Sequence, residues 1–282
     1  MISLKRFEEI KIEVENALNK AFDKVKEVSL GNYILFIGNG EYMDSIKDNP
    51  KLSPYTIDDR TWFYKDETRL IFLSQFMRAF YSFPEGVTEV TDDSFRINLE
   101  FMVYSHIWES TSFLDKMSRL AHLANGEDYN WNVKIPEMGK HDFIRNDIKA
   151  LLNKQTLDLE TIIIKSFHSQ LRNAFAHSQY GIDIDKKCIY LANYKGASWE
   201  LKEISTDDWS ERFAYGIWLS FLLLKVVVER RKSLIEDCGT NTFTIKHPSR
   251  DGKKVSDVKV VYEKERDYFS FERNETKDVD KK

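Results

Sequence analysis

The sequence predicts a mainly α-helical protein organised as an antiparallel helical bundle. The chain of 282 residues contains only 11 glycines and 5 prolines, roughly half of the average usage of these turn-forming residues. Hydrophobic residues make up 42% of the chain, and in long segments they recur every three or four positions, as the buried face of a helix requires. Composition therefore excludes collagen-like and low-complexity classes and argues against a turn-rich all-β protein.

Helical periodicity and capping residues predict helices over six segments. In chain order these are residues 4–28, 66–82, 93–124, 142–152, 157–180 and 205–234. Asp93 or Ser94 is expected to cap the third helix. Its predicted apolar face includes Leu99, Met102 and Val103.

The last predicted helix is expected to lie at the centre of the fold. Ser205 and Asp208 introduce it and resemble a capping box with Asp in the position of Glu. The helix is apolar on most of its sides, which is typical of a buried helix. Its most apolar stretch, residues 213–228, is short for a membrane span and contains Lys225. We therefore expect no association with a membrane.

Shorter segments are predicted as strands. Residues 33–37 form an apolar run that predicts a strand or a buried segment. Two β-rich runs, 182–184 and 188–191, predict a hairpin inserted into the bundle, and residues 198–204 can add a strand. Residues 241–271 alternate in polarity and predict a small β appendage.

This pattern predicts three parts of the chain. Residues 1–90 form a helical N-terminal region of unknown role, and residues 91–237 form the helical bundle with its β-hairpin. Residues 238–282 form a β-hairpin-like appendage that ends in a charged, disordered tail.

The small number of cysteines and the lack of a recognisable signal peptide predict a cytoplasmic protein. Two cysteines, Cys188 and Cys238, cannot form a disulfide framework, and no signal peptide is recognisable at the N-terminus. The net charge of −4 argues against a general nucleic-acid coat protein. It leaves room for a local basic site, because such a site acts within about 8 Å at physiological salt.

Runs of like charge in the sequence are best explained by their positions at helix ends. Asp58-Asp59 adjoins a predicted helix start, where carboxylates favour the helix dipole. Arg230-Arg231-Lys232 ends a predicted helix and is expected to complement the dipole there, with RNA binding as the alternative.

The candidate catalytic residues lie near the end of the predicted helix 157–180. There Arg172 and Asn173 are followed by His177, a combination expected by chance roughly 0.02 times in such a chain. RNA can be cut without a metal when its 2′-oxygen attacks the adjacent phosphate. A histidine can move the proton, an arginine can bind the phosphate and stabilise its growing charge, and an asparagine can orient either group.

Helix geometry places Asn173 and His177 on one face of the helix and Arg172 on another. Five residues of an ideal helix place Arg172 and His177 about 140° apart around its axis. Asn173 and His177, four residues apart, lie on one face. Arg172 must therefore reach around the helix, or the site must be shared between two chains.

The motif and its helical setting resemble the signature of the HEPN superfamily, an Arg and a polar residue followed by a His four to six residues after the Arg. The resemblance covers roughly residues 91–237 and implies a HEPN-like antiparallel bundle. It also implies a metal-independent endoribonuclease that leaves a 2′,3′-cyclic phosphate on RNA such as tRNA or mRNA. Such enzymes act in toxin–antitoxin growth control or in antiviral abortive infection.

The resemblance also implies partners. HEPN proteins commonly pair so that two motifs face one cleft, so a homodimer is expected, with an antitoxin or another defence component as a further partner. In one group a nucleotidyltransferase antitoxin modifies a tyrosine two places after the histidine. Here Gln179 holds that place and Tyr180 follows it, which departs from the pattern.

These considerations assign roles to the candidate residues. His177 is the predicted acid and base, Arg172 the phosphate-binding and charge-stabilising group, and Asn173 the orienting residue. Three neighbours are candidates for substrate binding: His168, Gln170 and Tyr180. The scattered histidines and two distant cysteines predict no metal site, and no cofactor is expected.

Two other interpretations of the motif stay open. Arg172 and His177 can be ordinary residues near a helix C-terminus, where positive charge is favourable. Other members of the resembled superfamily are non-catalytic scaffolds, so the alternative function is a binding module that recognises a protein partner or a nucleotide.

Overall fold

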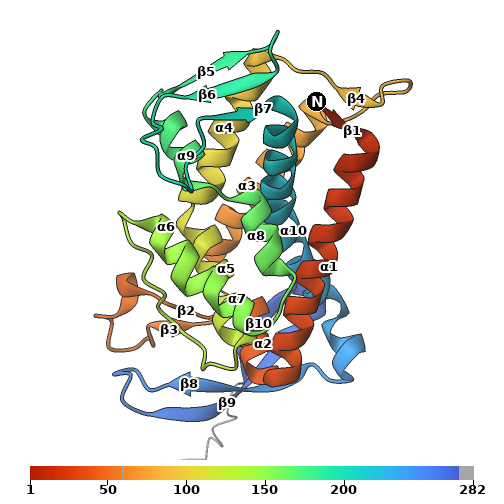
Figure 1. Ribbon diagram of the computed structural model, residues 1–282. Coiled ribbons are helices and arrows are strands. Elements are labelled where there is room, and N and C mark those ends of the chain that lie inside the picture. The colour runs from red at the N-terminus through yellow and green to blue at the C-terminus, as the bar shows by residue number, and fades with distance from the viewer. Residues whose placement is uncertain (59, 273–282) are drawn as a thin grey trace, which may run out of the picture.

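The computed structural model describes residues 1–58 and 60–272, with the backbone alone for residues 60–65. The protein is mainly helical, as predicted, with long helices side by side and a small sheet at each end of the bundle (Figure 1). None of the helices in these ranges combines the length and apolar character that a membrane crossing needs. The disordered tail predicted from the sequence falls almost entirely on residues 273–282, outside the described residues.

The helices follow the predicted order with some additional breaks. They are α1 (Leu4–Val28), α2 (Leu30–Ile37), α3 (Arg60–Phe80), α4 (Ser94–Glu109), α5 (Thr111–Ala124), α6 (Lys140–Phe143), α7 (Ala150–Lys154), α8 (Leu159–Ser166), α9 (Ser169–Ala176) and α10 (Thr206–Cys238). A π-helical segment, Ile144–Lys149, joins α6 to α7, and short 3-10 turns lie at Asp44–Ile46 and Lys264–Arg266.

The strands form small antiparallel sheets. They are β1 (Ile2–Ser3), β2 (Glu41–Tyr42), β3 (Tyr55–Thr56), β4 (Glu89–Val90), β5 (Tyr180–Asp183), β6 (Cys188–Leu191), β7 (Glu203–Ser205), β8 (Thr242–Pro248), β9 (Val255–Glu263) and β10 (Tyr268–Phe271). The predicted hairpin is the β5–β6 pair, to which β7 adds a third strand. The predicted appendage is the sheet β8–β9–β10.

Helix α10 is the centre of the fold, as its apolar character predicts. It packs against α1, α3, α4 and α8, and its buried side chains include Trp209 and Phe213. The Asp208 N–H donates to the Ser205 hydroxyl at 3.0 Å, which satisfies one of the unpaired donors of the first turn. One hydrophobic cluster contains residues of all three parts of the chain.

Residues 33–37 are helical and buried. Of the two alternatives predicted for this segment, the strand is wrong and the buried segment is confirmed. Ser29 adopts an extended conformation after α1, and its hydroxyl accepts from the Asn32 N–H at 3.3 Å, which starts α2. Five consecutive apolar residues fit a short buried helix as well as a strand. Gly31 does not stop a helix but lies inside α2, where an added Cβ would meet the Thr244 carbonyl oxygen at 2.9 Å.

The helix predicted over residues 93–124 is two helices, which corrects the sequence interpretation. Ser110 leaves the helical conformation between α4 and α5, and its hydroxyl accepts from the Phe113 N–H at 3.3 Å. Asp93 is the residue that caps α4, as one of the two predicted alternatives. The placement of Met102 in the core is wrong, because its side chain is 55% exposed.

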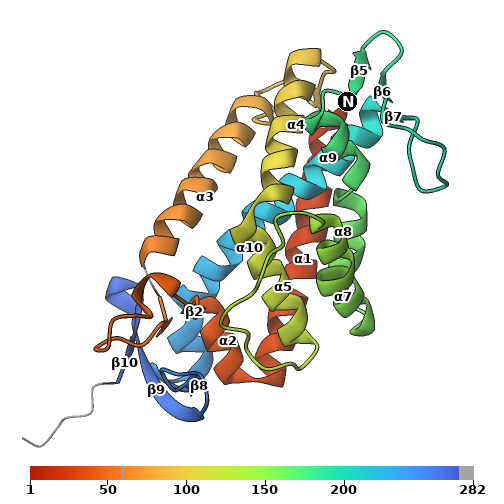
Figure 2. The same cartoon turned by 90° about the vertical axis from the view of Figure 1, so that its left-hand side faces the viewer.

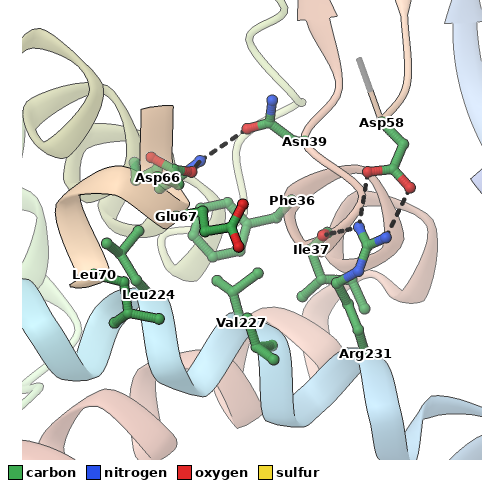
Figure 3. Close-up of a pocket in the computed structure, with 12 residues that line it drawn as sticks. Phe36, Ile37, Asn39, Asp58, Asp66, Glu67, Leu70, Leu224, Val227 and Arg231 are labelled. Carbon is green, nitrogen blue, oxygen red and sulfur yellow. Dashed lines mark hydrogen bonds and ion pairs between the residues drawn. The ribbon is translucent and has the colours of Figure 1, made fainter. Parts of the chain in front are cut away.

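A buried arginine joins α10 to the β appendage. Arg231 is 4% exposed, and its guanidinium donates to both carboxylate oxygens of Asp58, at 3.1 and 2.7 Å (Figure 3). It also donates to the Ile37 carbonyl and to both the side chain and the carbonyl of Asp267. The Phe269 N–H in β10 donates to Asp58 at 2.8 Å. Arg231 is therefore a buried structural group. The predictions that it complements the dipole at a helix end or binds RNA are wrong.

We predict that Arg231→Met lowers the free energy of unfolding by about 3–5 kcal/mol, because it leaves the Asp58 carboxylate buried without its cation. Urea denaturation measures the loss. Replacing Asp58 with Asn in the same chain should restore part of it, since the amide carries no charge and tolerates the positive φ of 58° found there. Additive losses in the double variant would contradict this coupling.

Candidate functional site

The helix predicted over residues 157–180 breaks just before the motif, which corrects the sequence interpretation. Phe167 and His168 are extended and separate α8 from α9. The His168 N–H donates to the Tyr104 hydroxyl of α4 at 2.8 Å, so a side chain replaces the helical hydrogen bond at this point. The motif therefore lies on the short helix α9, which packs against α4.

His177 is the C-cap residue of α9, and the chain turns sharply after it. The Gln179 N–H donates to the Ala174 carbonyl at 2.7 Å, and the Ser178 N–H donates to the Phe175 carbonyl at 3.0 Å. These two bonds form a Schellman motif, which requires a left-handed residue after the cap. Ser178 holds that place with a φ of 54°. The turn leaves the side chain of His177 exposed at the end of the helix.

His177 and Asn173 line an open cavity of about 490 Å³ between α9 and the loop that follows β6. The loop contributes Lys195 and Trp199, and the indole of Trp199 is 60% exposed. Glu200 also lines the cavity. Its carboxylate accepts from the backbone N–H groups of Lys195 at 2.6 Å and of Ala197, and these bonds hold the loop in shape. The cavity thus brings together the imidazole of His177, several side-chain amides, one lysine, one carboxylate and the aromatic face of Trp199.

Arg172 does not line this cavity. Its guanidinium pairs with the Glu109 carboxylate of α4 at 2.6 Å, and it is 21% exposed. Lys140 also pairs with Glu109, at 2.7 Å. The structure therefore brings Asn173 and His177 together and leaves Arg172 on another side of α9, as the helical geometry of the sequence predicts.

Gln170 is 3% exposed and occupied by structural hydrogen bonds. Its amide nitrogen donates to the Leu201 carbonyl at 2.8 Å and to Asn193 at 3.1 Å, and its amide oxygen accepts from the Leu201 N–H at 2.7 Å. Although Gln170 lines the floor of the cavity, its side chain serves to fasten the loop to α9.

Tyr180 packs into the fold. Its ring lies 5.0 Å from the ring of Phe101 and 5.8 Å from that of Phe175, and its hydroxyl donates to Asn98 of α4. These contacts occupy both the face and the tip of the side chain, so it is not among the residues that line the cavity.

His168 lies at the opposite end of α9 from His177. Its ring is 6.4 Å from the ring of Trp199, and its Nδ1 is buried without a hydrogen-bond partner among the described residues. Burial and the positive charge of Arg212 lower the pKa of His168 below its ordinary value of 6.5. The geometry makes His168 a packing neighbour of the cavity wall.

Sequence reasoning did not identify Lys195 and Trp199 as site residues. They lie 18 and 22 positions after His177 in the chain, in a loop that the β5–β6 hairpin brings back to α9. A tryptophan four positions after a lysine was an available signal in the sequence, since such a pair suits a base and a phosphate.

Comparisons with known proteins add no family. No family model matches this chain. No curated protein and no solved structure matches it either. In the described part of the chain, no cluster of three or more His, Cys, Asp or Glu side chains is arranged to hold a metal ion. Function must therefore be inferred from the residues and their geometry.

We predict that Ser178→Gly keeps or raises the free energy of unfolding, by up to about 1 kcal/mol, because glycine adopts a positive φ without strain. Ser178→Val should lower it by about 1–2 kcal/mol, since a β-branched side chain is strained there. Urea denaturation of both variants measures this, with Ser198→Gly as the control in a loop residue of ordinary φ. Equal stability of Ser178→Val and wild type would contradict the turn geometry.

We predict that the protein loses stability as the pH falls from about 7 to 5. Because the pKa of His168 is lowered in the folded state, the unfolded chain, whose histidine binds a proton near pH 6.5, takes up more protons than the folded state as the pH falls, so acid favours unfolding. The contribution is complete above pH 6.5 and is lost as the pH falls toward the lowered pKa. His168→Gln should reduce the slope of the stability profile measured by denaturation at each pH, and an unchanged slope would contradict this prediction.

Proposed function

We propose that the protein is a metal-independent endoribonuclease of the HEPN type that acts in the cytoplasm in antiviral defence or growth control. The observation that supports this most is the cavity in which exposed His177 lies with Asn173, Lys195 and Trp199. These four groups match the needs of RNA cleavage: a proton carrier, an orienting amide, a cation for the phosphate and a platform for a base.

The proposed reaction is an internal transesterification. The RNA 2′-oxygen attacks the adjacent phosphorus while its proton passes to the imidazole of His177, and the bond from phosphorus to the 5′-oxygen breaks. The leaving 5′-oxygen must receive a proton from a second, protonated imidazole. Because the cavity contains one histidine, we propose that His177 of a second copy supplies it in a homodimer.

Lys195 and Trp199 extend this proposal to substrate binding. The ammonium group of Lys195 would pair with a phosphate oxygen, and the exposed indole of Trp199 would stack on a base, an interaction worth about 1–3 kcal/mol per base in single-strand binding. Stacking accepts any base, so the geometry favours single-stranded segments of tRNA or mRNA over a defined sequence.

One observation favours a second function, that of a non-catalytic binding module. Arg172, the residue predicted from the sequence to bind the phosphate, does not line the cavity and is paired with Glu109. If this pair persists in the assembled protein, the cavity can hold a nucleotide or a partner peptide without cutting it. An antitoxin or another defence component would then be the partner.

We predict that the wild-type protein cleaves total RNA and tRNA in the presence of EDTA and leaves 2′,3′-cyclic phosphate ends. His177→Ala should reduce the rate at least 100-fold, since general acid–base catalysis contributes about 10²–10⁴-fold. Lys195→Ala and Trp199→Ala should mainly weaken RNA binding. End mapping and initial rates measure these effects.

The matched control is His122→Ala, which removes a histidine outside the cavity and should cleave like wild type. Unchanged cleavage by His177→Ala would overturn the assignment of the site. RNA binding by wild type without cleavage, lost in Lys195→Ala, would favour the binding module.

A further inference from the structure

A second cavity lies between α3 and α4. Figure 2 shows α3 lying at the outer edge of the bundle beside α4. The cavity is an open groove of about 820 Å³, a size typical of small-molecule sites. Its walls are two helical stripes that face each other, Arg69, Phe72 and Phe76 on α3 and Leu99, Met102, Val103 and His106 on α4.

The walls of this groove are largely apolar and open to solvent. The side chains of Phe72 and Met102 are 42% and 55% exposed. Phe76 and Val103 form the buried floor. Several large apolar groups gathered in one concave place indicate a binding site more strongly than scattered ones do.

One end of the groove carries a cation without a matching anion. The Nε of Arg69 is buried and has no hydrogen-bond partner among the described residues, and its guanidinium forms no ion pair within them. Asp66, one turn away, pairs instead with Lys116 at 3.1 Å. Burial lowers the pKa of Arg69 below its ordinary value, and the charge of Asp66 offsets this only in part.

His106 lies at the same end of the groove as Arg69. Its ring lies 5.8 Å from the ring of Phe72, edge to face. Burial and the positive charge of Arg69 lower the pKa of His106 below its ordinary value. The charge that reaches the groove is therefore positive, and a partly buried cation of this kind is stabilised by a bound anion.

We propose that this groove binds a free amphiphilic carboxylate of medium chain length, with its carboxylate on Arg69 and its alkyl chain between Phe72 and Met102. Seven helical steps separate Arg69 from Phe76, about 10 Å along the helix, which suits one chain of this size. The head group of a cationic amphiphile would be repelled by the positive charge of Arg69. A neutral one would bury the guanidinium further without pairing it.

The test uses sodium decanoate as the probe and titration calorimetry with the full-length protein. Wild type should bind decanoate, and Arg69→Gln should weaken binding at least tenfold. Arg78→Gln, in an exposed arginine of the same helix, is the matched control and should bind like wild type. The exposed position of Met102 allows a second variant, Met102→Glu, which should abolish binding while the protein stays folded, as circular dichroism can verify.

Further probes decide between occupants. Decanol should bind at least tenfold more weakly than decanoate, and decyltrimethylammonium should not bind. Equal binding of decanol and decanoate, or of wild type and Arg69→Gln, would overturn the proposal. So would binding to anionic phospholipid vesicles without binding of decanoate. A dimer in sedimentation that Met102→Glu dissociates, with no binding of decanoate by wild type, would identify the groove as an interface between copies and would also overturn it.

Discussion

The buried carboxylate of Glu100 fixes the position of α4, on which the rest of the structure depends. Glu100 is fully buried, and it accepts hydrogen bonds from the Tyr81 hydroxyl after α3, the Arg96 guanidinium and the Trp209 indole of α10, the last at 2.8 Å. Burial raises the pKa of Glu100 above its ordinary value, even beside Arg96. A carboxyl group held at this depth is costly without its partners, so these hydrogen bonds tie α4 to α10 and to the end of α3.

Much of the fold could be predicted from local signals. The bounds of α1 and the β5–β6 hairpin follow from periodicity, and the start of α10 follows from the Ser205 cap. The errors lie where tertiary contacts decide. The break before α9 depends on the hydroxyl of Tyr104, which comes from 64 residues away, and no glycine or proline marks it. The exposure of Met102 depends on how α3 lies beside α4, which helical periodicity does not specify.

The candidate site was predictable only in part, for the same reason. The shared face of Asn173 and His177 and the separate direction of Arg172 follow from the helical repeat alone. Lys195 and Trp199 enter the cavity through the β5–β6 hairpin, whose register pairs Tyr180 with Leu191 and so returns the loop to α9. Sequence spacing carries no information about that return. A short motif can therefore identify the helix of a site without identifying the residues that face it.

The ion pair between Arg172 and Glu109 is weak enough to be compatible with catalysis. Both side chains are partly exposed, at 21% and 38%, and such pairs contribute about 0–1 kcal/mol. Release of Arg172 would also leave Glu109 paired, because Lys140 donates to its carboxylate at 2.7 Å and to its carbonyl at 3.1 Å. A phosphate that approaches Arg172 can thus compete with Glu109 without leaving its carboxylate unpaired.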